Sequence, residues 1–375
     1  MPRLLCILHT SPPVHGASSV GDRILLSNTI QNEFNCKFVP INAAKSLDEI
    51  GVFSFTKLVR TVLLFWNVFV NICVYKPDII YFTPSTSGAA FYRDVIISAV
   101  WRVYAKLFCC EIYYHFHTRG ISKFRAKSRL NQILVTYFLS GTNVILLSQR
   151  LQKEFSGVSS VKKYHYLNNG IENNLSEVQF TEILQNKFRK VEEINILFLS
   201  NMIKEKGYLD VLTLACDSSN NNYKFHLAGR WEAEKDKLEF ENFISQNDLK
   251  EKVVHHGFVS GHSKHKLLKM AHLMVFPTRY EKEAFPLVLL EGLSYGIPIV
   301  STDVGGIPDI VSKETGILID EGSSLRTAVA KVCEEFLSPK VAIACRRRYI
   351  EHYQASDFDR NLISILNSSQ LNSIE

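Results

Sequence analysis

Glu283 and Glu291 are the residues whose type and spacing first suggest chemistry, because eight positions separate two carboxylates around an apolar run. Phe285, Pro286 and the run 287–290 lie between them. Polar groups at one end of a buried segment are typical of a ligand site at the edge of a core. The alternative is a capped core helix with two solvated glutamates, and the spacing alone leaves both interpretations open.

The segment after Glu283 has the signals of a helix that begins at Pro286. Proline suits the first helical turn because its missing N–H would be unpaired there. Gly296 fits the left-handed position after the helix, and Pro298 follows as a stop signal. The free N–H groups of a helix start favour phosphate, whereas a carboxylate accepts hydrogen bonds from sugar hydroxyls. The segment therefore suits a ligand with both groups, such as a nucleotide sugar.

Two successive runs of alternating strand and helix patterns must position these residues. This rhythm predicts an α/β protein with parallel, doubly wound sheets, which bind ligands beyond the carboxyl ends of their strands. Two such domains facing each other would form a cleft. The expected strands are 4–9, 36–41, 78–83, 111–117 and 144–148 in the first half and 194–200, 223–229, 253–256, 273–276 and 297–301 in the second; the expected helices of the first half are 21–34, 55–75 and 92–108.

Several motifs resemble those of the retaining glycosyltransferases of family 4, which have the two-domain, Rossmann-like GT-B architecture. The resemblance is strongest in E-A-F-P-L-V-L-L-E at 283–291 and G-I-P-I-V-S-T-D-V-G-G-I-P at 296–308. It extends upstream to I-L-F-L-S-N-M-I-K-E-K-G at 196–207 and, more weakly, to Y-Y-H-F-H-T at 113–118. The resemblance implies that the C-terminal helices pack back on the N-terminal domain.

This resemblance implies transfer of a hexose from a nucleotide-diphosphate sugar to a polysaccharide or lipid-linked saccharide acceptor. Glu291 would hold the ribose, Lys206 the diphosphate, and Glu283 the hexose. The donor phosphate would take the acceptor proton, with no cofactor and no obligatory metal. The implied catalytic residues are His117, Glu283 and Lys206, and the implied donor-binding residues are Gly16, Asn201, Lys206, Arg230, Glu283, Ala284, Phe285, Pro286, Leu287 and Glu291.

The sequence departs from the family pattern at two phosphate-binding positions. Asn201 stands five positions before Lys206, where similar enzymes carry an arginine, so Arg230 or Arg279 would have to compensate. Gly16 represents the family's glycine loop without the usual second glycine. A plain surface lysine is the alternative for Lys206, and these departures keep open a non-catalytic subunit that binds nucleotide sugars.

His115 and His117 lie on one face of an expected strand because side chains alternate along it. His117 would lie near the transferred sugar, as in resembling enzymes, and a histidine there can donate a hydrogen bond. A pair at this spacing is also compatible with a metal site, but no third ligand has suitable spacing. A hydrogen-bonded core histidine is the alternative for His115.

The length of 375 residues and the 46% hydrophobic content predict two globular domains. We expect an acceptor-binding domain at 1–175, a nucleotide-sugar domain at 176–345, a helical segment at 346–375, and a polar linker at 173–193. Residues 1–175 hold 19 Lys and Arg against 9 Asp and Glu, a charge of +10, whereas the remainder is net acidic. The basic half suggests an anionic partner.

Five basic residues follow His117 closely. They form either a solvated surface or a contact for an anionic acceptor or membrane, to which the helix 55–75 would add Phe65, Trp66 and Phe69. The cluster comprises Arg119, Lys123, Arg125, Lys127 and Arg129.

The remaining features concern localisation and competing classes. Eight scattered cysteines and a first apolar run too short for a signal peptide predict a cytoplasmic protein, with peripheral binding to the inner face of the membrane as an extension. The longest apolar run, 61–75, is too short to span a bilayer. A sugar-nucleotide epimerase or phosphorylase of the same architecture is the nearest rival, and a nucleic-acid binder lacks any recognisable module.

Overall fold

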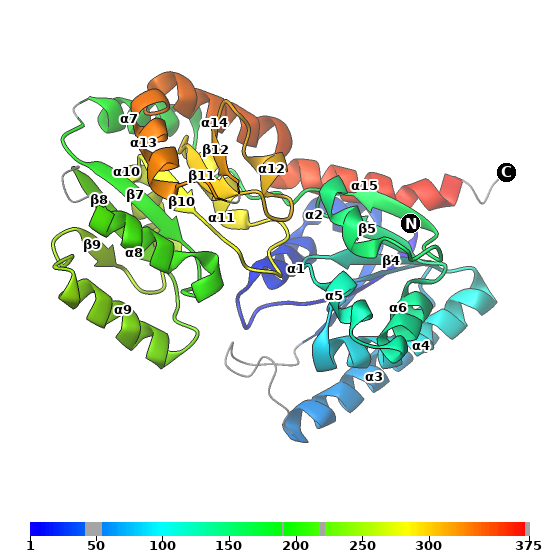
Figure 1. Ribbon diagram of the computed structural model, residues 1–375. Coiled ribbons are helices and arrows are strands. Elements are labelled where there is room, and N and C mark those ends of the chain that lie inside the picture. The colour runs from blue at the N-terminus through cyan, green and yellow to red at the C-terminus, as the bar shows by residue number, and fades with distance from the viewer. Residues whose placement is uncertain (42–54, 190, 218–221, 321, 372–375) are drawn as a thin grey trace. The chain divides into compact units, whose positions relative to one another are not determined.

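The computed structural model describes residues 1–41, 55–189, 191–217, 222–320 and 322–371. The chain divides into two compact units, which are described separately. Unit 1 comprises Met1–Asn169 and Ser356–Glu375, and unit 2 comprises Gly170–Ala355. In both units helices pack around a central sheet (Figure 1).

Unit 1 is built on six parallel strands in the order β2-β1-β3-β4-β5-β6. Its central strands are continuous apolar runs because helices cover both faces of the sheet. Strand β6 was not expected from the sequence, since its short K-Y-H-Y run lacks a clear apolar pattern. The strands are β1 (Arg3–Leu8), β2 (Asn35–Pro40), β3 (Ile79–Phe82), β4 (Glu111–Phe116), β5 (Asn143–Leu146) and β6 (Lys163–Tyr166).

The helices of unit 1 differ from expectation mainly near the N-terminus. The segment expected as one helix at 21–34 begins earlier and divides at Ser27, whose hydroxyl accepts a hydrogen bond from the Ile30 N–H and so starts a second helix. The helices are α1 (Gly16–Leu26), α2 (Asn28–Glu33), α3 (Phe55–Tyr75), α4 (Gly88–Phe108), α5 (Ile121–Ala126), α6 (Arg129–Leu139) and the 3-10 helix η1 (Gln149–Phe155).

Unit 2 has six parallel strands in the order β12-β11-β10-β7-β8-β9, the strand order of a dinucleotide-binding Rossmann sheet. The polar stretch expected as a linker contains helix α7, which a Ser176–Gln179 capping box starts. The strands are β7 (Ile194–Leu199), β8 (Tyr223–Ala228), β9 (Val253–His255), β10 (Leu273–Phe276), β11 (Ile299–Thr302) and β12 (Gly316–Ile319). The helices are η2 (Lys204–Lys206), α7 (Glu177–Phe188), α8 (Tyr208–Asp217), α9 (Glu234–Gln246), α10 (Gly261–Met270), α11 (Leu287–Ser294), α12 (Ile307–Ile310), α13 (Leu325–Glu335) and α14 (Pro339–His352).

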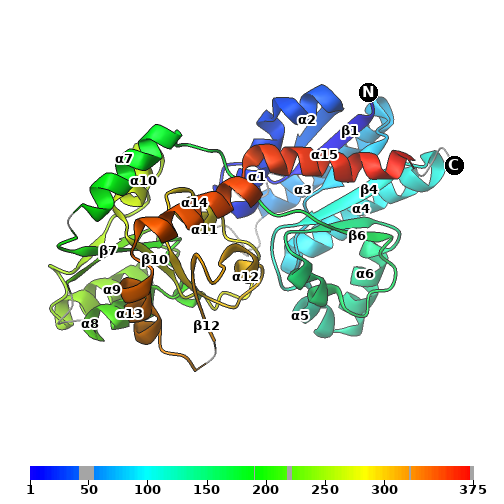
Figure 2. The ribbon, with the colours of Figure 1, turned by 90° about the horizontal axis from the view of Figure 1, so that it is seen from above.

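The last helix, α15 (Ala355–Leu371), packs on unit 1 (Figure 2), whereas residues 346–355 of the expected C-terminal segment belong to unit 2. Its Asp359 carboxylate lies 2.5 Å from the Arg23 guanidinium, and the Tyr113 hydroxyl donates a hydrogen bond to the Ile365 carbonyl at 3.1 Å. Asp359 also accepts a hydrogen bond from Ser27. These polar contacts attach the end of the chain to the first sheet.

Each sheet has a point where the strand order reverses, and ligands of open parallel sheets bind there. In unit 2 this point lies between β7 and β10, which pair directly. In unit 1 it lies between β1 and β3. A ligand site is therefore expected in the loops that follow these strands.

Candidate active site

The loop after β7 carries Lys206 to the point where the strand order of unit 2 reverses. Gly207 follows with a φ of +91°, and a Cβ there would lie 2.6 Å from the Pro277 carbonyl oxygen. Only glycine accommodates both conditions without strain. This close approach places Lys206 beside the loop that leaves β10.

Lys206 and Glu283 form the centre of the candidate site. The Lys206 Nζ lies 3.2 Å from the Glu283 Oε2, and both side chains are largely buried. The same ammonium faces the rings of Phe276 and Tyr280 at 5.8 and 5.4 Å. The ion pair does not have hydrogen-bond geometry, and the buried Glu283 Oε2 has no hydrogen-bond donor. The ion pair thus holds the Lys206 ammonium in place, and the Glu283 Oε2 remains able to accept a hydrogen bond from a ligand.

The backbone after Glu283 leads directly into helix α11. Ala284 and Phe285 are buried, and Pro286 is the N-cap, one position before the first helical residue Leu287. Pro286 therefore stands one position earlier than the first helical position that its sequence signal indicates, a shift that is common at helix ends. The first N–H groups of α11 lack helical partners and offer a site for an anion.

A second loop supports this backbone from behind. Gly305 has a φ of +60°, and a Cβ on it would lie 2.5 Å from the Glu283 carbonyl oxygen. The Gly306 N–H donates a hydrogen bond to the Ala284 carbonyl at 2.7 Å. The paired glycines therefore have a packing role, because they let the two loops lie against each other.

Glu291 lies in the second turn of α11 and is ion-paired. Its Oε1 is 2.6 Å from the Nζ of Lys264 on α10, and both side chains are partly exposed. No local sequence pattern indicates Lys264, because the contact joins two helices that are separate in the chain. The carboxylate keeps its second oxygen for a hydroxyl group of a ligand.

None of the three other residues considered for phosphate binding is a largely buried cation like Lys206. Asn201 is partly exposed directly after β7. Arg230 is exposed and lies over the Phe258 ring at 4.8 Å. Arg279 is exposed, and its guanidinium is 2.5 Å from the Asp210 carboxylate. Among the described residues, Lys206 is thus the cation that the fold holds against Glu283.

His117 lies immediately after β4, at the carboxyl edge of the unit 1 sheet. Neither of its ring nitrogens has a hydrogen-bond partner, and its ring centroid is 4.2 Å from that of His115. Burial lowers the pKa of His117 to about 3, with His15 and Arg23 contributing further. A neutral imidazole with two available nitrogens can both donate and accept a hydrogen bond. His115 is a core histidine, since its Nδ1 lies 2.6 Å from the Tyr81 hydroxyl.

The loop that follows β1 contains two further histidines, which the sequence patterns did not indicate as site residues. Burial lowers the pKa of both His9 and His15. His15 caps helix α1, and Gly16 is the first residue of that helix, with open space where a Cβ would lie. Packing requires a glycine at Gly21 rather than at Gly16, because a Cβ on Gly21 would be 1.9 Å from the His9 carbonyl oxygen.

The basic cluster after His117 separates into two groups. Arg119 is ion-paired with Glu154 at 3.1 Å, and the Arg125 guanidinium donates to the Ser156 and Gly157 carbonyls. These two residues support the local structure. The exposed members are Lys123, Lys127 and Arg129.

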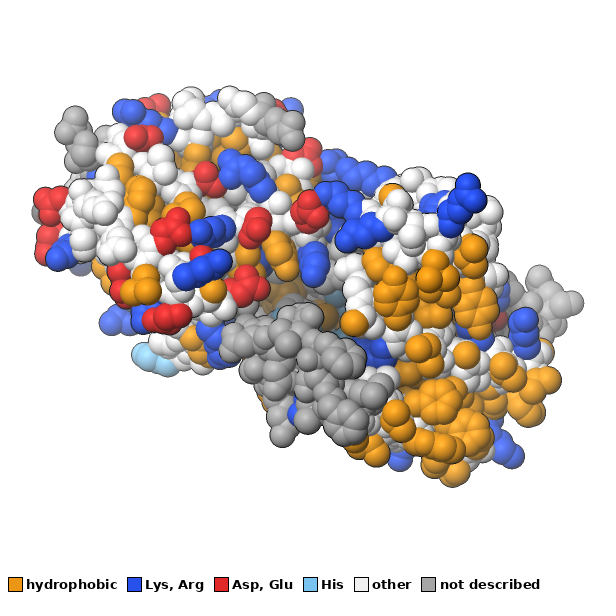
Figure 3. Space-filling model, turned by 60° about the horizontal axis from the view of Figure 1, so that its bottom comes forward, with side chains coloured by type: hydrophobic (Ala, Val, Ile, Leu, Met, Phe, Trp, Pro, Cys, Tyr) orange, Lys and Arg blue, Asp and Glu red, His pale blue; other side chains and the backbone are white. Residues whose placement is uncertain are grey.

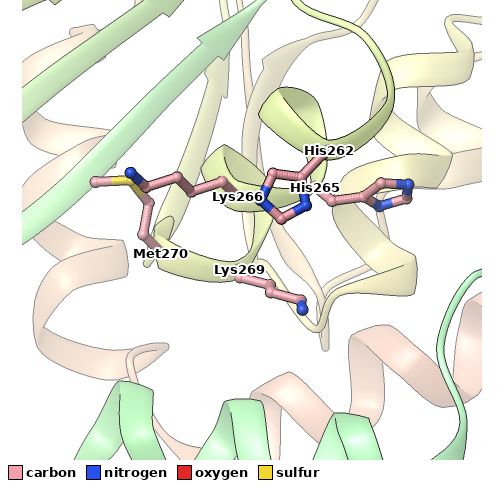
Figure 4. Close-up of a pocket in the computed structure, with 5 residues that line it drawn as sticks. All are labelled: His262, His265, Lys266, Lys269 and Met270. Carbon is pink, nitrogen blue, oxygen red and sulfur yellow. The ribbon is translucent and has the colours of Figure 1, made fainter.

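A hollow of about 350 Å³ beside α10 lies apart from these residues (Figure 4). Its lining comes from one helix and contains none of the candidate donor-site residues. In the part of the chain that the structure describes, no three His, Cys, Asp or Glu side chains are grouped to hold a metal ion. The lining residues are His262, His265, Lys266, Lys269 and Met270.

The two doubly wound units and their edge loops define the fold as that of the GT-B glycosyltransferases. HepE from Anabaena, solved in complex with UDP-glucose, superposes with a TM-score of 0.71 at 16% identity over 97% of this chain and 99% of that one. WaaG, a glycosyltransferase involved in lipopolysaccharide biosynthesis, superposes with a TM-score of 0.67 at 16% identity over 97% of this chain and 100% of that one.

Residues 179–352 match the model of the glycosyl transferases group 1. The chain is also 30% identical over 192 residues to the uncharacterized glycosyltransferase MJ1607 from Methanocaldococcus jannaschii, covering 49% of this chain and 47% of that protein. The chain thus spans about half the length of the curated relatives it matches. The matched region of the family model contains Lys206, Glu283 and Glu291.

Proposed function

We propose that this protein is a retaining glycosyltransferase that moves a hexose from a nucleotide-diphosphate sugar to a polysaccharide or lipid-linked saccharide. The observation that carries the proposal is the Lys206–Glu283 pair, 3.2 Å apart beside the N-terminus of α11. A cation and a helix start suit a diphosphate, and a buried carboxylate suits a sugar hydroxyl. The family match of this region and the UDP-glucose bound by HepE support the choice of donor.

Each site residue has a role in this proposal. Lys206 neutralises the diphosphate as negative charge develops on it, which is electrostatic stabilisation by a fixed group. Glu283 accepts a hydrogen bond from a hexose hydroxyl, and the backbone from Ala284 to Leu287 holds the phosphate. Glu291 accepts from the ribose. Neutral His117 donates a hydrogen bond to the hexose or the departing phosphate.

The proposed transfer balances without a further reactant. The bond between the anomeric carbon and the donor phosphate oxygen breaks, and a bond to the acceptor oxygen forms on the same face. The acceptor proton passes to the departing phosphate, which leaves as part of the nucleoside diphosphate. We propose that no metal is obligatory, so that activity persists in excess chelator; a complete loss that added metal restores would contradict this.

The donor is tested with a thermal-shift panel of nucleoside diphosphates and their sugars. A ligand that binds the folded state raises the melting temperature, so one base and one sugar should stabilise the protein most. Glu291→Gln should weaken the nucleoside diphosphate about tenfold, because a hydrogen bond to a charged group is lost. The matched control is Glu314→Gln, whose carboxylate is exposed and pairs with Arg347 away from the site. Equal affinity in wild type and Glu291→Gln would exclude the ribose role.

A non-catalytic subunit that binds nucleotide sugars is the second candidate. It is favoured by Asn201, which stands where similar enzymes carry an arginine, and by the engagement of Arg279 with Asp210. Product analysis with a labelled donor and saccharide acceptors distinguishes the two candidates. Transfer with retained anomeric configuration supports the enzyme, whereas tight donor binding without transfer to any acceptor supports the subunit.

A further inference from the structure

Exposed apolar side chains gather on three helices of unit 1: α3, α4 and α6. The two helix pairs α3–α4 and α4–α6 are in contact, so their outer sides adjoin. Figure 3 shows hydrophobic side chains massed over this part of unit 1. We call this surface the α3–α4–α6 face and represent it by Leu63, Trp66, Ile96, Leu107, Leu130 and Ile133, which are 56–70% exposed.

The concentration of these side chains separates this surface from the ordinary exposure of single apolar residues. In unit 2, Val178, Leu238 and Ile343 are 52–69% exposed, but they lie on three different helices. Contiguous exposed apolar patches mark sites of interaction with proteins or membranes. The α3–α4–α6 face is therefore a candidate site for binding a protein or a membrane.

The charges of the face indicate which kind of partner it can bind. The sequences of α3 and α6 contain no Asp or Glu. Helix α4 has one carboxylate, Asp94, which is buried and paired with Arg93 at 2.7 Å. Lys106 and Arg129 are exposed among the apolar side chains. The face is thus apolar and cationic, without an exposed carboxylate on these helices among the described residues.

A groove of about 580 Å³ between α4 and α6 brings cations and hydroxyl groups together within this face. Arg102 lies over the Tyr137 ring at 4.6 Å, and Lys106, Gln132, Thr136 and Ser140 complete the polar lining. Ile133 lines the same groove. Two cations beside an apolar side chain suit a phosphate group that is attached to a hydrocarbon.

We propose that the α3–α4–α6 face docks on the surface of a lipid bilayer that contains anionic phospholipids. The apolar side chains would enter the acyl boundary, while Lys106 and Arg102 would meet lipid phosphates. A second copy of the chain is disfavoured because it would bring the same cations together without carboxylates to pair them. None of the described helices has the length and apolarity needed to cross a bilayer.

This assignment differs from a docking site formed by the basic cluster after His117. Arg119 and Arg125 make contacts within unit 1 and hold loops there. Among the five, Arg129 is the member that begins α6 and so belongs to the face. The proposal is independent of the donor chemistry in unit 2.

Vesicle flotation of the full chain tests the proposal. The protein should float with vesicles of phosphatidylcholine and phosphatidylglycerol, and less with phosphatidylcholine alone. The variant Leu63→Ser/Trp66→Ser/Ile133→Ser should bind at least about tenfold more weakly, because three apolar anchors are lost. Lys106→Glu/Arg129→Glu should remove the preference for phosphatidylglycerol. In addition, brominated acyl chains should quench Trp66 fluorescence, an effect that Trp66→Phe removes.

The matched control is Val178→Ser/Leu238→Ser/Ile343→Ser, which likewise replaces three exposed apolar side chains by serine, but on unit 2, and should bind like wild type. Circular dichroism melts check that all variants are folded. Absence of flotation by wild type, or equal flotation by the face variant, would overturn the proposal. So would a dimer in analytical ultracentrifugation that dissociates on the Leu63→Ser/Trp66→Ser/Ile133→Ser change, because the face would then contact a second copy.

Discussion

The Lys206 ammonium lies 3.2 Å from the Glu283 carboxylate, across the two loops that leave β7 and β10. Those strands pair directly at the point where the strand order of the second sheet reverses. The pair therefore stands where ligands of Rossmann sheets bind. Its two residues come from separate motifs, and the strand order brings them together.

Replacement of this lysine tests its electrostatic role. Lys206→Ala should lower kcat/KM for glycosyl transfer about 100-fold or more, because a charge placed toward the leaving diphosphate is lost. Lys204→Ala is the matched control, since Lys204 lies in the same loop but pairs with Asp236 and Glu239 and is 42% exposed. That control should change activity less than about threefold. Comparable losses in the two variants would refute a specific role for Lys206.

The support of the donor loop by Gly305 can be probed with a single methyl group. Gly305→Ala should raise KM for the donor and destabilise the fold by about 1–3 kcal/mol, because its Cβ would meet the Glu283 carbonyl at a φ of +60°. Gly141→Ala is closely matched in backbone conformation, with a φ of +70° and open space for a Cβ. Donor titration and urea unfolding should separate the variants; unchanged KM in Gly305→Ala would show that the loop tolerates displacement.

The buried histidines of unit 1 make stability depend on pH. Burial lowers the pKa of His117 from 6.5 to about 3, so the unfolded chain binds its proton first. The free energy of unfolding should therefore fall as the pH drops from about 6.5 toward 3, by up to about 1.4 kcal/mol per pH unit for this group. Urea unfolding of wild type and His117→Gln at pH 7, 6 and 5 measures the difference.

The contribution of His117 is the change in slope between these two proteins. His117→Gln should flatten the pH dependence, whereas the exposed-residue control His262→Gln should leave it unchanged. Identical slopes for wild type and His117→Gln would mean that the imidazole is solvated in the folded state.

Two adjacent arginines on α14 should differ sharply in their effect on stability. Arg346 is buried and donates hydrogen bonds to the Ser294 and Leu175 carbonyls. Arg346→Met should cost about 3–5 kcal/mol, because buried acceptors lose their charged donor. The exposed Arg347 pairs with Glu314, so Arg347→Met should cost less than about 1 kcal/mol in chemical denaturation. Equal costs would contradict the burial of Arg346.

Local sequence patterns predicted most of the elements of both sheets. The expected strand 273–276 matches β10, and the helix 55–75 matches α3, because apolar periodicity and flanking turn residues act over a few positions. The same reasoning missed β6, whose K-Y-H-Y run has a weak apolar pattern, and β12, whose apolar G-I-L-I run is only four residues long. It also interpreted 173–193 as a linker, although a capping box begins α7 within it.

Those parts of the candidate site that depend on local sequence signals could also be predicted. The Pro286 and Gly296 signals located α11, and Gly296 has the expected positive φ of +66°. Lys264 beside Glu291 and the unpartnered nitrogens of His117 could not be foreseen, because each depends on neighbours from other elements. The basic cluster after His117 was a single feature in the sequence but has two roles in the fold.

The amino-acid sequence by itself determined where strands end and which loops carry lysine, glycine and carboxylates, because helix caps, turns and apolar periods are local properties of the chain. Tertiary structure decided which of those groups meet. The order of strands set Lys206 against Glu283, the packing of α14 buried Arg346 but exposed Arg347, and the adjoining α3, α4 and α6 gathered apolar side chains into one face. These outcomes depend on contacts between distant segments, which no local pattern encodes.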